Sequence, residues 1–166
     1  GGAAAPPELM TEPRRGVSPP VAVAFAAVGF FALLIAGFGM LSLLSGAEVI
    51  AVPGLGPLPG AIATGAATVV FAVTTWIAVR RRHPSYGAVV VIVIATFLAY
   101  LAGLAVGAVF AATDAARTAA AIGAFATSWF ALVLAAAALV AGWAGIALVR
   151  TRAGRPRWPW EQDDRP

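Results

Sequence analysis

The chain has 166 residues, of which 61% are hydrophobic and only 11% are charged. A soluble domain usually carries about 25% charged residues, so the composition favours a membrane protein over a soluble helical bundle. Cysteine is absent and His83 is the one histidine, which excludes disulfides, thiol catalysis, thiolate metal sites and paired-histidine haem ligation.

The basic balance of the chain comes from arginine alone. Eleven arginines and no lysine stand against seven acidic residues, which gives a net charge of +4. These arginines flank apolar runs and do not cover one helix face, so they indicate membrane topology rather than a nucleic-acid site. We expect no nucleic-acid partner.

The N-terminal arm, residues 1–18, is predicted to be disordered. Residues 1–9 precede Met10. They are expected to be vector-encoded or the product of a start codon assigned too far upstream, and the fold prediction does not use them.

Four long apolar runs follow, at residues 19–45, 58–79, 87–112 and 118–149. Each reaches the length of about 20 residues that a helix needs to cross a hydrocarbon core of about 30 Å. The sequence therefore predicts an all-α membrane protein, with four transmembrane helices over residues 19–149 and a basic tail over residues 150–166.

The first run also resembles a signal peptide, because Arg14 and Arg15 precede it and Ser45-Gly46-Ala47 follows it. A signal h-region is usually only about 7–15 residues long, and this run is much longer. We therefore expect it to be retained as a transmembrane helix.

The last run is longer than one crossing requires. A straight helix from Asp114 to Val149 would extend about 54 Å at about 1.5 Å per residue. We expect Asp114 to cap a helix start. Either the helix then tilts and protrudes from the membrane, or residues 114–123 lie along the outer membrane surface and the chain turns inward near Gly123; we favour the second arrangement.

An even number of crossings places both termini on one side of the membrane. The arginine clusters around Arg14, Arg80 and Arg150 then share that side, and only Arg117 faces the other. Arginine in short loops marks the cytoplasmic side, so both termini are predicted to be cytoplasmic. The composition, rich in alanine and arginine, is typical of high-GC bacteria and favours a bacterial inner membrane.

No acidic or basic side chain lies inside the four runs. A charge at a helix centre costs about 2.5 kcal/mol or more and marks ion paths and proton relays. Proton-coupled transport and intramembrane hydrolysis are therefore disfavoured, and we expect no enzyme activity, no cofactor and no metal. Tyr100 needs a hydrogen-bond partner, which a hydroxyl of the second run could supply.

Small residues recur every four positions in the third run, at Ala99, Gly103, Gly107 and Ala111. Such spacing forms a groove in which two helices approach closely. The pattern predicts a helix-packing contact, either within one chain or between the chains of a homo-oligomer.

Two basic segments are candidate contacts for lipid phosphates or for an acidic partner. They are the end of the second run and the tail, with the residues Arg80, Arg81, Arg82, Arg155, Arg157, Trp158 and Trp160. Arginines near a membrane attract anionic headgroups, and indole rings suit the membrane interface.

Two proline motifs give the chain a family likeness. Gly-Pro-Leu-Pro-Gly occupies residues 56–60, and Gly-Arg-Pro-Arg-Trp-Pro-Trp-Glu occupies residues 154–161. Together with the four runs, they resemble a group of small, uncharacterised actinobacterial membrane proteins over residues 10–166. That family has no assigned activity, so the resemblance implies no functional residues.

These features favour an accessory, structural or membrane-organising subunit. It would lie in the lipid bilayer and act by helix packing, within a homo-oligomer or a larger membrane complex. The alternative is a small oligomeric transporter or channel for neutral or lipidic solutes, which would need a continuous cavity lined by Thr64, Thr68, Thr96 and Tyr100.

Overall fold

The computed structural model describes residues 17–50, 56–81 and 85–150. The N-terminal arm up to residue 16, Arg82, His83 and the tail from residue 151 lie outside these ranges, together with the predictions made for them. The described chain forms five helices: α1 (Pro19–Ser45), α2 (Leu58–Val79), α3 (Ala88–Phe110), α4 (Ala115–Ala126) and α5 (Trp129–Arg150).

Four of these helices, α1, α2, α3 and α5, are long and apolar enough to cross a membrane. They contain 27, 22, 23 and 22 residues, against the roughly 20 that a crossing requires. The predicted all-α class with four membrane-crossing helices is confirmed. The bounds of α1 and α2 coincide with the predicted runs, and α3 lies within the third run.

Proline and glycine set the ends of the first two crossings. Prolines occupy the first turn of α1 and of α2, where a missing N–H removes no helical hydrogen bond. Gly46 ends α1 with a left-handed φ of 64°, and its N–H donates to the Ser42 carbonyl. A residue with a side chain adopts that backbone conformation at a cost, so the glycine ends the helix at this point.

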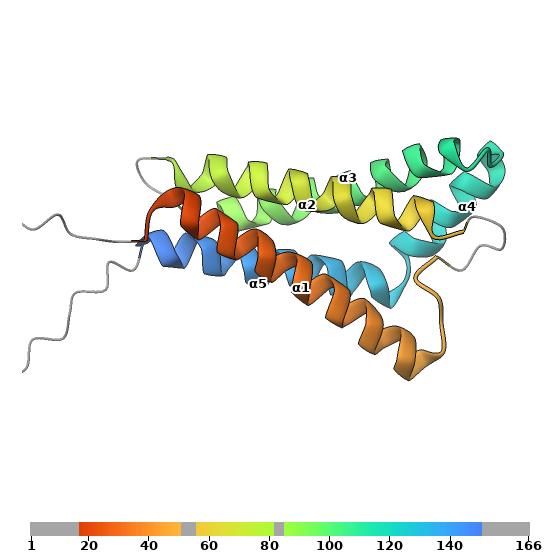
Figure 1. Cartoon of the computed structure of the whole chain (residues 1–166), viewed down its shortest axis with the longest axis horizontal. Helices are drawn as coiled ribbons and strands as arrows, with labels where there is room; N and C mark the ends of the chain where they lie inside the picture. Colours follow the sequence, from red (N-terminus) through yellow and green to blue (C-terminus); the bar gives the residue numbers. More distant parts are fainter. Residues whose placement is uncertain (1–16, 51–55, 82–84, 151–166) are drawn as a thin grey trace, which may run out of the picture.

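The bundle has two distinct ends (Figure 1). At one end α1 begins, α2 ends, α3 begins and α5 ends; we call it the arginine-bearing end, because it carries Arg80, Arg81 and Arg150. The other end, called the α4 end, carries the α1–α2 connection and α4. The described acidic residues, Glu48 and Asp114, belong to the segments at the α4 end.

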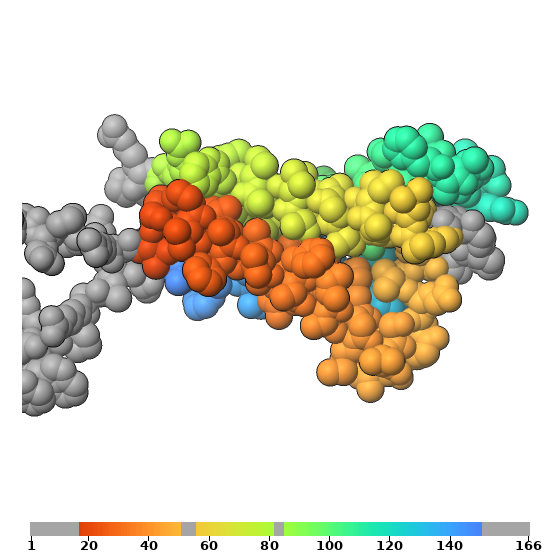
Figure 2. Space-filling view, viewed as in Figure 1, coloured from red at the N-terminus to blue at the C-terminus, as the bar shows by residue number. Residues whose placement is uncertain are grey.

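Packing is closest between α2 and α3, and α1 packs mainly on α5. Near the middle of the bundle, Phe30 of α1 stacks on Phe71 of α2, with ring centroids 4.5 Å apart. Towards the α4 end α1 diverges from α2, and the molecule broadens there (Figures 1 and 2).

The last apolar run is divided into α4 and α5. The 12 residues of α4 extend about 18 Å, too short to cross about 30 Å of hydrocarbon. The fourth crossing therefore starts at Trp129 and not near residue 118, and the break lies after Ala126 and not at Gly123.

Two hydroxyl groups add hydrogen bonds at this break. The Thr127 hydroxyl donates to the Gly123 carbonyl at 2.9 Å, and the Ser128 hydroxyl donates to the Phe125 carbonyl at 2.7 Å. The same two carbonyls also accept the backbone N–H groups of Thr127 and Ser128, at 3.2 and 3.0 Å, so the last turn of α4 is fully bonded before α5 begins. At the other end of α4 the predicted cap is confirmed, because the Asp114 carboxylate accepts the Arg117 backbone N–H at 2.8 Å.

An aromatic cluster joins four helices near the α4 end. Tyr100 stacks on Phe125 with centroids 4.3 Å apart, and Phe38 meets Phe130 edge-on at 5.5 Å. Phe38 also meets Tyr100 and Phe125 edge-on, at 6.1 and 6.2 Å. Offset and edge-on ring pairs contribute energy beyond the area they bury, so this cluster holds α4 against the diverging end of α1.

Candidate functional site

The arginine-bearing end combines cations with aromatic rings. The Arg80 guanidinium lies 5.1 Å from the centre of the Trp76 ring, and the Arg150 guanidinium lies 4.6 Å from that of Tyr86. Tyr86 in turn stacks on Trp143 of α5, with centroids 6.4 Å apart. Cations are attracted to the faces of such rings, so both arginines are held beside rings of the kind that gather at membrane interfaces.

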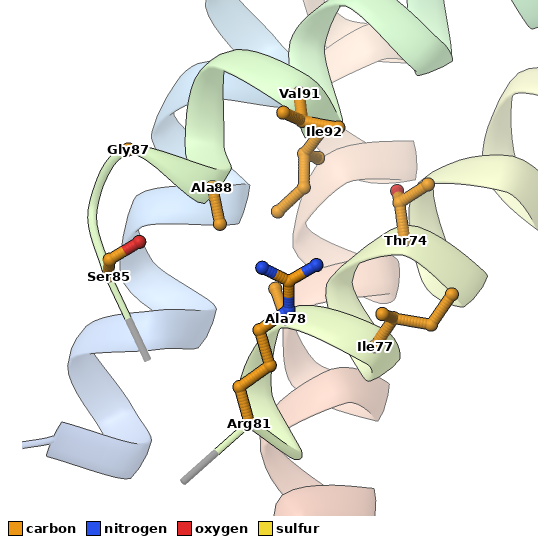
Figure 3. A pocket seen from close by; sticks show the side chains of 9 residues that line it. All are labelled: Thr74, Ile77, Ala78, Arg81, Ser85, Gly87, Ala88, Val91 and Ile92. Atoms are coloured by element: carbon orange, nitrogen blue, oxygen red, sulfur yellow. The ribbon is translucent and has the colours of Figure 1, made fainter. Parts of the chain in front are cut away.

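A pocket of about 330 Å³ opens at this end, between the last turns of α2 and the first turns of α3. This volume falls within the range of about 300–1,000 Å³ that is usual for ligand sites. The pocket is lined by Thr74, Ile77, Ala78, Arg81, Ser85, Gly87, Ala88, Val91 and Ile92 (Figure 3).

The polar part of the pocket centres on Arg81, whose guanidinium group points into the space between the two helices (Figure 3). Within the described residues no carboxylate pairs with Arg81. Ser85 lines the same space from the loop before α3. The start of α3 adds the positive end of a helix dipole, so this part of the pocket favours an anion.

The remaining walls are apolar. Ala78 and Ile92 are buried and form the floor, whereas Ile77 and Val91 are 52% and 63% exposed. In a membrane-crossing helix, an exposed apolar side chain faces the lipid. The pocket therefore has an apolar side open towards the hydrocarbon and a cationic group close to the helix ends.

The polar side chains that line this pocket are those of Thr74, Arg81 and Ser85. Thr74 offers no free proton, because its hydroxyl already donates to the Val70 carbonyl at 2.7 Å. Among the described residues, no group of three or more histidine, aspartate or glutamate side chains lies close enough together to hold a metal ion.

The small residues of α3 lie against α2. A methyl group added at Gly107 would come within 2.5 Å of the Pro59 Cα atom, and one added at Gly103 within 2.7 Å of the Ala63 Cα atom. Ala99 and Ala111 are half-buried at the ends of the same row. Of the two alternatives left open by the sequence, the contact of Gly103 and Gly107 is within one chain.

The four residues proposed to line a solute path are arranged differently. Thr96 and Tyr100 are fully buried, and Thr68 donates its hydroxyl to the Thr64 carbonyl at 2.8 Å. Thr64 of α2 lies within reach of the Tyr100 side chain, where the predicted hydroxyl partner was expected. None of the four residues lines the pocket beside Arg81.

Sequence reasoning singled out Arg81 but missed the rest of the pocket. Thr74 and Ser85 meet there because α2 and α3 pack at the register fixed by Gly103 and Gly107. The small-residue spacing indicates that α3 has a close neighbour, but it does not tell which helix or register is chosen. The short connection between α2 and α3 is the sequence signal that predicts these two helices to be antiparallel neighbours.

Comparison with known proteins identifies the family. The model of a family of unknown function, DUF6121, matches residues 10–166. The chain belongs to the DUF6121 family. The match covers the same residues as the resemblance noted from the two proline motifs, and that group is likewise without an assigned activity. Neither the curated proteins nor the solved structures gave a match.

Proposed function

We propose that this DUF6121 protein is a non-catalytic accessory or structural subunit of a bacterial inner membrane, with its arginine-bearing end and both termini on the cytoplasmic side. The observation that carries the proposal is the two arginine–aromatic pairs at one end of a bundle whose crossings α1, α2 and α3 contain no aspartate, glutamate, lysine, arginine or histidine.

The charge distribution supports the orientation. Ten of the eleven arginines in the sequence flank the segments at the arginine-bearing end, and Arg117 lies at the α4 end. Positive residues in short loops are retained on the cytoplasmic side. The composition, rich in alanine and arginine and without lysine, supports an origin in a high-GC bacterium of the actinobacterial kind.

The helix surfaces support a role in assembly. Buried charge is the usual mark of a proton relay or an ion path, and its absence from the described crossings α1, α2 and α3 favours binding through their surfaces. α1 leaves its neighbours towards the α4 end, and Met40, Leu43 and Leu44 are exposed there. A second membrane helix or lipid would cover that surface in the bilayer.

A second candidate function is a small oligomeric transporter or channel for neutral or lipidic solutes. The observation in its favour is that the hydroxyl oxygens of Thr75 and Thr96 are buried without a hydrogen-bond partner among the described residues. Buried polar groups are usually satisfied, and a state of the bundle that admits a solute or water would satisfy these two.

Native mass spectrometry on protein extracted with its surrounding lipids tests the proposal. A subunit is expected to appear as a homo-oligomer or as a complex with one other membrane protein, at a fixed stoichiometry. Proteoliposomes containing it should take up small neutral solutes such as glycerol no faster than protein-free vesicles.

The opposite pair of results would contradict the proposal. A monomer without any partner of fixed stoichiometry, together with solute uptake above that of protein-free vesicles, would favour the transporter. Uptake that Thr96→Val abolishes would then assign the path to the buried threonines.

A further inference from the structure

We infer that the pocket between α2 and α3 at the arginine-bearing end binds one anionic phospholipid, with the lipid phosphate on Arg81 and an acyl chain along Ile77 and Val91. The inference rests on the proposed function only for the position of this end in the cytoplasmic headgroup layer.

The pocket carries a positive charge. Arg81 points into the pocket, and no carboxylate among the described residues pairs with it. Arginine presents a planar set of donors that matches phosphate oxygens. Ser85 adds a hydroxyl at the same level, so a phosphate there would have donors from the end of α2 and from the loop before α3.

Arg81 differs in its surroundings from Arg80 and Arg150. Arg80 and Arg150 are each placed over an aromatic ring, at 5.1 and 4.6 Å from its centre. Neither of them lines the pocket. Arg81 is therefore the described arginine that faces the pocket, although all three belong to the same end.

The pocket opens towards the lipid-facing surface of the bundle. Its apolar rim, Ile77 and Val91, is 52% and 63% exposed on the lipid-facing surface, and its floor is apolar as well. A water-soluble phosphate has no apolar part to contact this rim, whereas a lipid held by its phosphate would lay an acyl chain along it. The combined chemistry is that of an anionic amphiphile.

The test is a lipid titration of the purified full-length chain in neutral detergent, followed by native mass spectrometry. Phosphatidylglycerol should bind first at one copy per chain. Arg81→Gln should weaken that first binding by about tenfold, as expected for the loss of one charged hydrogen-bonding partner. Arg80→Gln removes the same charge from the preceding residue and is the matched control, which should change the affinity less than about twofold.

Three further measurements test the site and identify its ligand. Val91→Trp should fill the mouth of the pocket and reduce binding without changing charge, because Val91 is exposed and its substitution leaves the core intact. Inorganic phosphate should fail to displace the lipid, and phosphatidylcholine should bind less tightly than phosphatidylglycerol.

Several outcomes would overturn the inference. Equal weakening by Arg81→Gln and Arg80→Gln would show a diffuse attraction of the whole end and not a pocket, while leaving the proposed subunit role standing. Displacement by inorganic phosphate alone would make this a site for a soluble anion. The absence of a first bound lipid would remove the site.

Discussion

At the scale of single residues, two glycines determine how closely α2 and α3 approach. The atoms facing Gly103 and Gly107 are backbone atoms of Ala63 and Pro59, which cannot rotate away as a side chain can. Small residues at such crossings allow backbones to meet and make dispersion contacts, which drive helix association in lipid.

Gly107→Ala is therefore expected to destabilise the bundle by about 1–3 kcal/mol, as overpacked contacts do. Thermal unfolding in detergent, followed by tryptophan fluorescence, measures the change. Gly65→Ala is the matched control in α2, because a methyl group there would meet no other atom within 4 Å. Equal melting temperatures for the two variants would contradict the close contact.

The buried hydroxyls of Thr75 and Thr96 give a second prediction at this scale. Because neither has a hydrogen-bond partner among the described residues, Thr96→Val should leave stability unchanged or raise it by about 1 kcal/mol. Thr68→Val is the control that breaks an existing hydrogen bond to the Thr64 carbonyl. Marked destabilisation by Thr96→Val in the same unfolding assay would mean that its hydroxyl is satisfied in the membrane.

At the scale of elements, the aromatic cluster holds α4 in place next to its break with α5. Phe125 is fully buried against Tyr100 and Phe38. Without this ring, α4 loses its main side-chain contact with the diverging end of α1.

Phe125→Ala should lower the unfolding free energy by about 3 kcal/mol, which is typical of a buried phenylalanine. Phe110→Ala removes the same ring from the end of α3, where it is 72% exposed, and should have little effect. Chemical denaturation in mixed micelles measures both variants. A smaller loss for Phe125→Ala than for Phe110→Ala would contradict the account of α4.

Sequence patterns predict the elements of this protein better than the contacts between them. Run lengths predict α1 and α2, and a lone aspartate in a short polar connection predicts the cap of α4. The break at Thr127 could not be predicted, because threonine and serine usually bond back to the preceding turn without ending a helix. In the folded chain Phe125 packs into the aromatic cluster just before this break.

The pocket could be predicted only in part, for a physical reason. Arg81 stands out because it belongs to a cluster that marks topology, but the sequence does not distinguish it from Arg80. Arg80 is the C-cap of α2, and its guanidinium lies over the Trp76 ring. Arg81 follows the end of the helix and lines the pocket, a result that depends on the packing of α2 against α3.

At the scale of the whole molecule, the proposed role and the proposed lipid site share one requirement. The arginine-bearing end must lie in the cytoplasmic headgroup layer, where anionic lipids attract arginine by about 1 kcal/mol per residue. If that end faced outward, the positive residues would oppose the usual rule of membrane insertion.

Cysteine labelling in intact cells tests this orientation most directly, because the natural sequence contains no cysteine. Single cysteines are introduced by Ser18→Cys before α1, Gly154→Cys after α5, and Ala116→Cys in α4, and are exposed to a membrane-impermeant thiol reagent. The account predicts that only Ala116→Cys reacts in intact cells and that all three variants react after the membrane is opened. Labelling of Ser18→Cys or Gly154→Cys in intact cells, with Ala116→Cys protected, would contradict it.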